Sequence, residues 1–214
     1  MSNQSVFGKN QQTIEFLRTH DFFRAVESAL DALESCHHYL FSHHGQENTS
    51  GYEDNTTLDQ KMFTGEALSS ADIAPSTFVY SEGIPIPVQA ERDYALTATI
   101  LVFNAALAHH LLAINLQNEA SSDLLRKAKK LYSMAHDSQD GDCNFLFRLA
   151  VVNNVGMIDQ ALGNIESAKT CFEYNLSMLM FLLDQGYEPS LLSRAHVFLT
   201  NVPVWNINNV APAA

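Results

Sequence analysis

The sequence predicts an all-α protein, because apolar residues recur at helical spacing along most of its 214 residues. The exception is a central block, residues 43–92, that is rich in Gly, Asn, Ser and Thr and has no sustained period. Elsewhere, Gly and Asn breaks leave only short loops between long amphipathic stretches, which is typical of antiparallel helix pairs. We therefore expect one helical domain, 1–214, with a long irregular insertion.

Composition narrows the choice of partners and compartment. Hydrophobic residues make up 46% of the chain, enough for a buried core. With 24 acidic against 12 basic residues, the net charge of −12 argues against nucleic acid and anionic membranes as partners. Cys36, Cys143 and Cys171 are isolated, as in proteins of reducing compartments, and the N-terminus lacks the apolar run of a secretory signal. We expect a cytoplasmic or nuclear protein.

The N-terminal stretch, 12–41, reads as a short helix followed by a longer one. Asp21 stands where an N-cap would restart the helix after Thr19 and His20. These two helices form the first predicted helix pair.

The insertion, 43–92, is far longer than an ordinary loop, so it is either disordered or has a function. Part of it, 76–88, has an extended pattern. Pro85 and Pro87 lack amide donors and disfavour helix in their neighbours, which predicts a strand or a polyproline conformation there.

The C-terminal half contains four strong helical patterns and a shorter fifth one. They cover 93–117, 122–136, 143–162, 165–183 and 190–201, with a tail at 202–214. The first of them is long enough to span a bilayer, and a membrane helix is one interpretation. Its Asn and His residues would be costly in hydrocarbon, so we expect a buried helix instead, with no membrane partner.

One segment carries a spaced series of small and aromatic residues. Gly156 is followed by Gly163, Ala168 and Phe172. Gly156 and Ala168 are small enough for two helix axes to approach closely, while Gly163 supplies the left-handed turn between them. Phe172, one turn after Ala168, would fill the space beyond that contact.

This series resembles the tetratricopeptide repeat family, particularly the longer repeats of kinesin light chains. Weaker copies have small or aromatic residues at spacings of four and three, although Ala106 precedes Ala128 by twenty-two residues instead of twelve. In the N-terminal copy His20 takes the place of the turn glycine. The weaker copies comprise Ala25, Ala29 and Ala32, and then Ala106, Ala128, Tyr132 and Ala135. The resemblance covers about 12–38 and 97–184, with two helix pairs in 93–184, and implies pairs stacked as a short α-α superhelix.

In that family the first helices of successive pairs line a groove for an extended peptide or a helix. When Asn104 is aligned with Asn154, the positions that line the groove in that family correspond to mainly apolar side chains in this sequence. They are Ile100, Phe103, Leu107, His110, Leu111, Ala150, Asn153, Met157 and Gln160. An apolar groove implies an apolar occupant, and the tethered segment 76–88 is a candidate. We expect it to pack against the 93–117 helix.

The resemblance implies a non-catalytic interaction or adaptor module that binds a protein or peptide. The sequence lacks a P-loop, a dinucleotide-binding glycine turn and a serine nucleophile elbow, so no catalytic residue or cofactor is predicted. An alternative is a small-molecule or metal-binding protein that uses the apolar cleft and the His-rich helix end, which comprises Cys36, His37, His38, His43 and His44. No pair there has the i, i+4 spacing of helical ligands, so no metal site is predicted.

Overall fold

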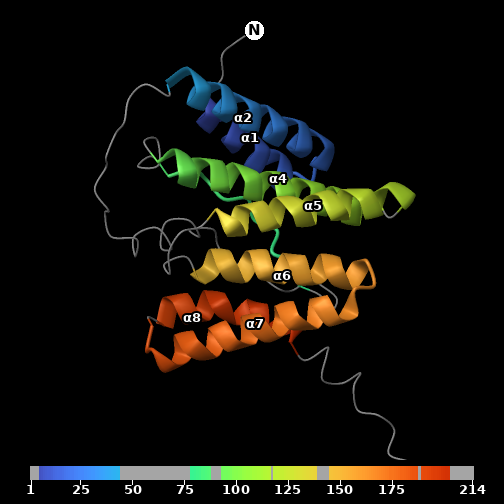
Figure 1. The fold of residues 1–214 in the computed structure, drawn as a ribbon, viewed down its shortest axis with the longest axis vertical. Helices are drawn as coiled ribbons and strands as arrows, with labels where there is room; N and C mark the ends of the chain where they lie inside the picture. The colour runs from blue at the N-terminus through green and yellow to red at the C-terminus, as the bar shows by residue number, and fades with distance from the viewer. Residues whose placement is uncertain are drawn as a thin grey trace, which may run out of the picture. The chain divides into compact units, whose positions relative to one another are not determined.

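The computed structural model describes residues 5–43, 78–87, 93–116, 118–138, 145–187 and 189–202. Every regular element among them is helical, and these residues contain no strand (Figure 1). The fold is therefore all-α, as predicted. The insertion outside 78–87 and the tail beyond residue 202 lie outside the described residues.

The helices of the C-terminal half begin and end within three residues of the predicted positions. The elements in order are α1 (Val6–Arg18), α2 (Phe22–His43), α4 (Tyr94–Leu116), α5 (Glu119–Asp137), α6 (Phe145–Ala161), α7 (Ile165–Asp184), α8 (Pro189–Ala195) and the 3₁₀ helix η2 (His196–Asn201). The predicted helix 190–201 is thus split between α8 and η2. The first helix also starts six residues earlier than predicted, because the Ser5 hydroxyl accepts a hydrogen bond from the Gly8 amide and caps it.

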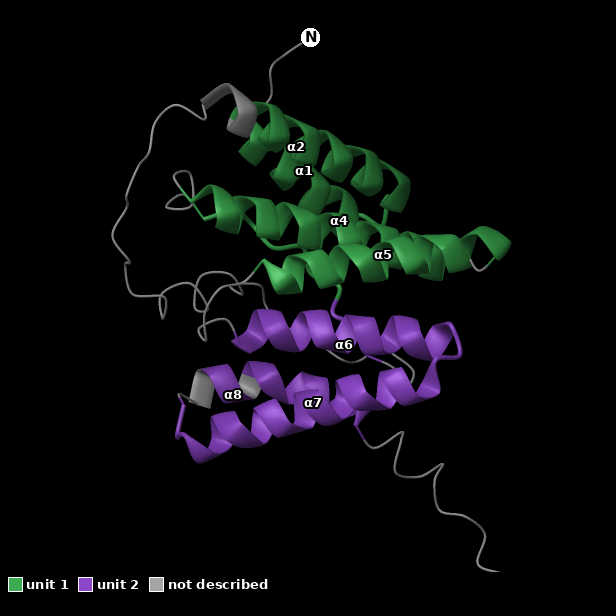
Figure 2. Ribbon diagram, in the orientation of Figure 1, with its two compact units in different colours: residues 1–64, 81–143 green, residues 65–80, 144–214 purple. Residues whose placement is uncertain are grey.

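The chain groups into two compact units, where the sequence led us to expect one domain (Figure 2). Unit 1 comprises 1–64 and 81–143, and unit 2 comprises 65–80 and 144–214. The division falls between Tyr80 and Ser81, so the two parts of the described segment 78–87 belong to different units.

In unit 1, α1 packs on α2, α2 on α4, and α4 on α5. α4 is the central helix and is buried on nearly all sides. It is long and apolar enough to cross a membrane, but 78% of its most apolar stretch is buried inside the structure. A small apolar cluster of Ala32, Cys36 and Leu101 joins α2 to α4. Burial of the Cys36 thiol in this cluster raises its pKa.

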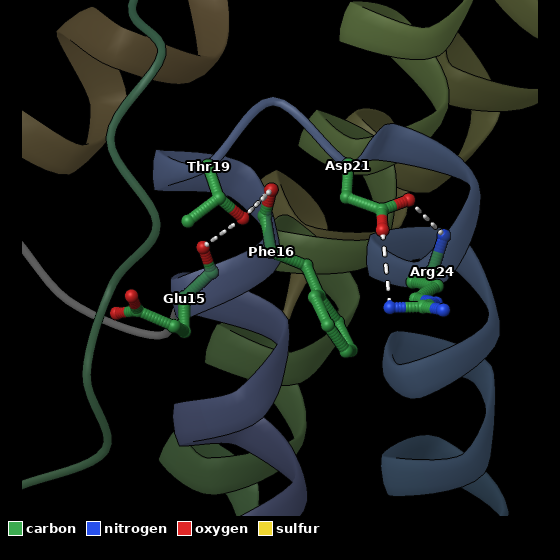
Figure 3. Close-up of polar contacts among 5 residues, drawn as sticks. All are labelled: Glu15, Phe16, Thr19, Asp21 and Arg24. Atoms are coloured by element: carbon green, nitrogen blue, oxygen red, sulfur yellow. Dashed lines mark hydrogen bonds and ion pairs between the residues drawn. The ribbon is translucent and has the colours of Figure 1, made fainter.

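Asp21 caps the start of α2, as the sequence predicted (Figure 3). Its Oδ1 accepts from the Arg24 amide at 3.4 Å, and its Oδ2 lies 3.5 Å from the Arg24 guanidinium. On the other side of the turn, the Thr19 hydroxyl donates to the Glu15 carbonyl at 2.9 Å and closes α1. Side-chain hydrogen bonds therefore satisfy backbone groups at both ends of this short connection.

Three helices end with the same left-handed turn. The turn residue is His20 after α1 (φ 60°), Gly163 after α6 (φ 79°) and Gly186 after α7 (φ 68°). In each case the next amide donates to the carbonyl five residues back, at 2.9 Å after His20, 2.8 Å after Gly163 and 3.4 Å after Gly186. The predicted equivalence of His20 and Gly163 is confirmed, and His20 adopts a conformation that normally favours glycine.

In unit 2, α6 packs closely on α7 at Gly156. A Cβ atom at Gly156 would lie 2.9 Å from Phe172 Cε1 and 3.0 Å from Cys171 Cβ. The predicted close approach is therefore confirmed. Its nearest neighbours are Phe172 and Cys171, whereas the sequence pointed to Ala168, which is also buried.

We predict that Gly156→Leu lowers the free energy of unfolding by about 1–3 kcal/mol, because the larger side chain would force α6 away from Phe172. Urea denaturation followed by far-UV circular dichroism would measure the loss. The matched control is Ala161→Leu on the same helix, where the side chain is exposed and the change should stay within about 0.5 kcal/mol. Equal effects of the two substitutions would contradict the close contact.

Candidate functional site

The described part of the insertion, residues 78–87, is neither helix nor strand, yet three of its residues have both backbone polar groups hydrogen-bonded by side chains. Asparagines provide all three pairs of bonds. We call each such arrangement an asparagine clamp, meaning one side-chain amide that accepts from the N–H and donates to the C=O of the same residue.

The first clamp lies in unit 1, where Asn104 of α4 holds Ile84. The Ile84 amide donates to Asn104 Oδ1 at 2.8 Å, and Asn104 Nδ2 donates to the Ile84 carbonyl at 2.7 Å. Asn10 of α1 supports it, since its Oδ1 accepts from Asn104 Nδ2 at 2.8 Å and its Nδ2 donates to the Ile84 carbonyl at 3.2 Å. Both asparagines are buried, so two helices hold one residue of the segment.

The second clamp lies in unit 2, where Asn154 of α6 holds Tyr80. The Tyr80 amide donates to Asn154 Oδ1 at 2.9 Å, and Asn154 Nδ2 donates to the Tyr80 carbonyl at 2.9 Å. Asn154 is the residue that the repeat alignment pairs with Asn104. Two positions that correspond in the predicted repeat therefore make the same bidentate contact with the segment.

The third clamp, also in unit 2, joins Phe78 to Asn201 of η2. The Phe78 amide donates to Asn201 Oδ1 at 2.8 Å, and Asn201 Nδ2 donates to the Phe78 carbonyl at 2.7 Å. Asn153 links the second and third clamps. Its Nδ2 donates to Asn154 Oδ1 at 3.2 Å and to the Phe78 carbonyl at 3.0 Å, and its Oδ1 accepts from Asn201 Nδ2 at 2.6 Å. The three amides of unit 2 thus form one buried network.

Apolar contacts hold the side chains of the clamped residues. Ile84 is completely buried in the structure. In unit 2 the Tyr80 ring stacks on Phe198 with centroids 6.2 Å apart, and the Phe78 ring meets Phe198 edge to face at 5.6 Å.

The arrangement is chemically suited to holding an extended peptide. Each clamp uses only the main-chain N–H and C=O, which every residue except proline provides. Both prolines, at 85 and 87, follow the last clamped residue, so no clamp needs an amide there. Main-chain bonding of this kind supplies affinity, and the side-chain pockets beside it supply specificity.

The predicted packing of the segment against the 93–117 helix is confirmed for unit 1, where Asn104 holds Ile84. Of the predicted groove residues, Asn153 hydrogen-bonds the segment. Phe103 and His110 both pack on the Tyr132 ring of α5, with centroids 5.6 and 6.1 Å away. Ile100 and Leu107 are completely buried, while Leu111, Met157 and Gln160 are half-buried.

Sequence reasoning placed Asn153 in the groove but missed the other asparagines as contact residues. It used Asn104 and Asn154 only to align two helices, and it gave no role to Asn10 or Asn201. A signal was available at Asn104 and Asn154, since a polar residue in the middle of an otherwise apolar helix needs a buried hydrogen-bond partner. No local pattern marks Asn10 or Asn201.

The alternative ligand site at the His-rich helix end is not assembled among the described residues. His37 and His38 are exposed on α2, and the side chains of residues 40–44 lie outside the described part. Within that part, no three His, Cys, Asp or Glu side chains lie close enough together to hold a metal ion. Cys143 also lies outside the described residues.

The sequence matches no protein-family model, no curated protein and no solved structure. The resemblance to tetratricopeptide repeats therefore stays a prediction.

We predict that Asn104→Ala destabilises unit 1 by about 2–4 kcal/mol, because the Ile84 amide and Asn10 Oδ1 would lose their buried partner. Thermal and urea denaturation would measure the effect. The control is Asn115→Ala on the same helix, where the side chain is exposed and the change should stay within about 0.5 kcal/mol. A loss no larger than that of the control would contradict a structural role for the clamp.

A second prediction concerns His110, which lies inside α4 with no hydrogen-bond partner for Nδ1. Complete burial lowers its pKa to about 3 from the ordinary value of 6.5. The unfolded chain binds this proton more readily than the folded one, so stability is full above pH 6.5 and falls as the pH drops towards 3. The slope contributed by His110 is up to about 1.4 kcal/mol per pH unit.

Urea denaturation of the wild type and of His110→Leu between pH 7 and pH 4.5 would measure this slope. Burial also lowers the pKa of His109, and that contribution is common to both proteins. The variant should therefore lose less stability than the wild type as the pH falls. Parallel curves for the two proteins would show that His110 does not resist protonation in the folded state.

Proposed function

We propose that the protein is a non-catalytic interaction module that binds an extended segment of a partner protein through its asparagine clamps. In this proposal its own residues 78–87 occupy the same site when no partner is bound. The observation that carries the proposal is the repeated clamp, since Asn104 and Asn154 hold Ile84 and Tyr80 with the same pair of bonds.

Buried asparagines are expensive to leave without partners, so the site favours being filled. The protein's own segment, 78–87, fills the site through its main-chain N–H and C=O groups, which other extended peptides also have. A tethered occupant has an effective concentration in the millimolar range, which would keep weak competitors out and make binding depend on release of the segment. Displacement by a partner would then be a regulated step.

The test requires a chain whose own segment no longer fits. We call Tyr80→Asp/Ile84→Asp the released-segment variant: it puts a carboxylate at two buried positions of the segment and leaves every asparagine in place. A labelled synthetic peptide with the sequence of residues 78–87 is then titrated against this variant and against the wild type, with fluorescence anisotropy as the readout.

We expect the peptide to bind the released-segment variant at least about tenfold more tightly than the wild type, whose site is occupied. Adding Asn104→Ala and Asn154→Ala to the variant should abolish the binding. If the variant does not keep its helical circular dichroism, a chain with Gly-Ser residues in place of 78–87 serves instead. A folded chain that fails to bind the peptide would contradict the proposal and leave the segment a structural element.

A further inference from the structure

The sequence of the segment is constrained most strongly at Gly83, in unit 1. A Cβ atom there would lie 2.9 Å from Ile14 Cγ1 and 3.1 Å from Leu17 Cδ1, both on α1. Ile14 and Leu17 are themselves buried, so neither side chain can swing into solvent to make room. The backbone of Gly83 is not in the left-handed region, and the requirement for glycine is therefore one of space alone.

The next residue must be apolar. Ile84 follows directly, with its side chain completely buried and with its main-chain groups bonded by Asn104 and Asn10. A charged or polar side chain at this position would be buried without a partner. The clamp and the glycine contact together fix the register, because moving the segment by one residue would bring a side chain against α1.

The two residues after Ile84 differ from each other. Pro85 is exposed and its position needs no amide donor, so the site places little demand on it. Ile86 packs against the apolar cluster of Ala32, Cys36 and Leu101 between α2 and α4. Unit 1 therefore restricts the side chain at Gly83, Ile84 and Ile86. It places no restriction on the side chain at Pro85.

We propose that the natural partner of unit 1 is an extended segment of another protein that carries the pattern glycine–aliphatic–any residue–aliphatic, read at the positions of Gly83 to Ile86. This inference rests on the proposed function and adds the class of sequence that the site selects. Glycine is selected because a Cβ atom is excluded at Gly83, and the aliphatic residues are selected by burial at Ile84 and by packing on the Ala32, Cys36 and Leu101 cluster at Ile86.

The test uses the released-segment variant and a set of decapeptides based on residues 78–87, titrated by fluorescence anisotropy. Relative to the native sequence, we expect the Gly83→Ala peptide to bind at least tenfold more weakly. The Ile84→Asp and Ile86→Asp peptides should also lose at least tenfold. The matched control is the Pro85→Ala peptide, which should bind within threefold of the native one because its side chain is exposed.

The outcomes separate this inference from the proposed function. If the native peptide binds but the Gly83→Ala peptide binds equally well, the pattern glycine–aliphatic–any residue–aliphatic (the sequence rule) is wrong. The proposed binding function would not be affected by that result. If no peptide binds a folded variant, the proposed function fails as well. A wild-type chain that sediments as a dimer, and as a monomer once Gly83→Ala is introduced, would assign the site to a second copy and overturn the choice of another protein.

A second measurement applies even if the released-segment variant does not fold. Gly83→Ala in the full chain should accelerate hydrogen exchange of the Ile84 amide at least tenfold and leave the Tyr80 amide, which unit 2 holds, unchanged. Pro85→Ala should change neither amide. Unchanged exchange at Ile84 in Gly83→Ala would show that the contact with α1 tolerates a side chain and would overturn the sequence rule.

Discussion

The pairing of an asparagine side chain with both main-chain polar groups of one residue is the interaction on which the structure of this site depends. Residues 78–87 form no helix or strand, so their main-chain groups would lose water on burial without gaining partners. Asn104, Asn154 and Asn201 supply those partners at Ile84, Tyr80 and Phe78. The dependence is mutual, because the buried asparagines need a peptide, or water, in the same place.

This interaction separates affinity from specificity. The clamps bond to the main chain and would accept many sequences, whereas the surroundings are selective. Ile14 and Leu17 leave no room for a side chain at Gly83, and the ring of Phe198 receives aromatic residues in unit 2. In the proposed function, a partner segment of similar pattern would replace the protein's own segment by making the same main-chain hydrogen bonds.

Much of the fold could be predicted because its signals are local. Helical periodicity located α4 to α7, the glycine series located the close packing at Gly156, and the repeat alignment placed His20 at a left-handed turn. The face of α4 that meets the segment could not be predicted, because α4 is buried on nearly all sides and its apolar pattern distinguishes no face. The contacts of Asn10 and Asn201 join residues far apart in the sequence, and local patterns carry no trace of them.

Amide hydrogen exchange of the wild-type protein, resolved by residue across 78–87, tests the central claim most directly. The account predicts strong protection at the three clamped amides, those of Phe78, Tyr80 and Ile84, and rapid exchange at Val79, whose neighbours on both sides are held. Rapid exchange at all four amides would contradict the account, because it would show that the asparagines do not hold the segment. The proposed binding site, and its occupation by residues 78–87, would then both be wrong.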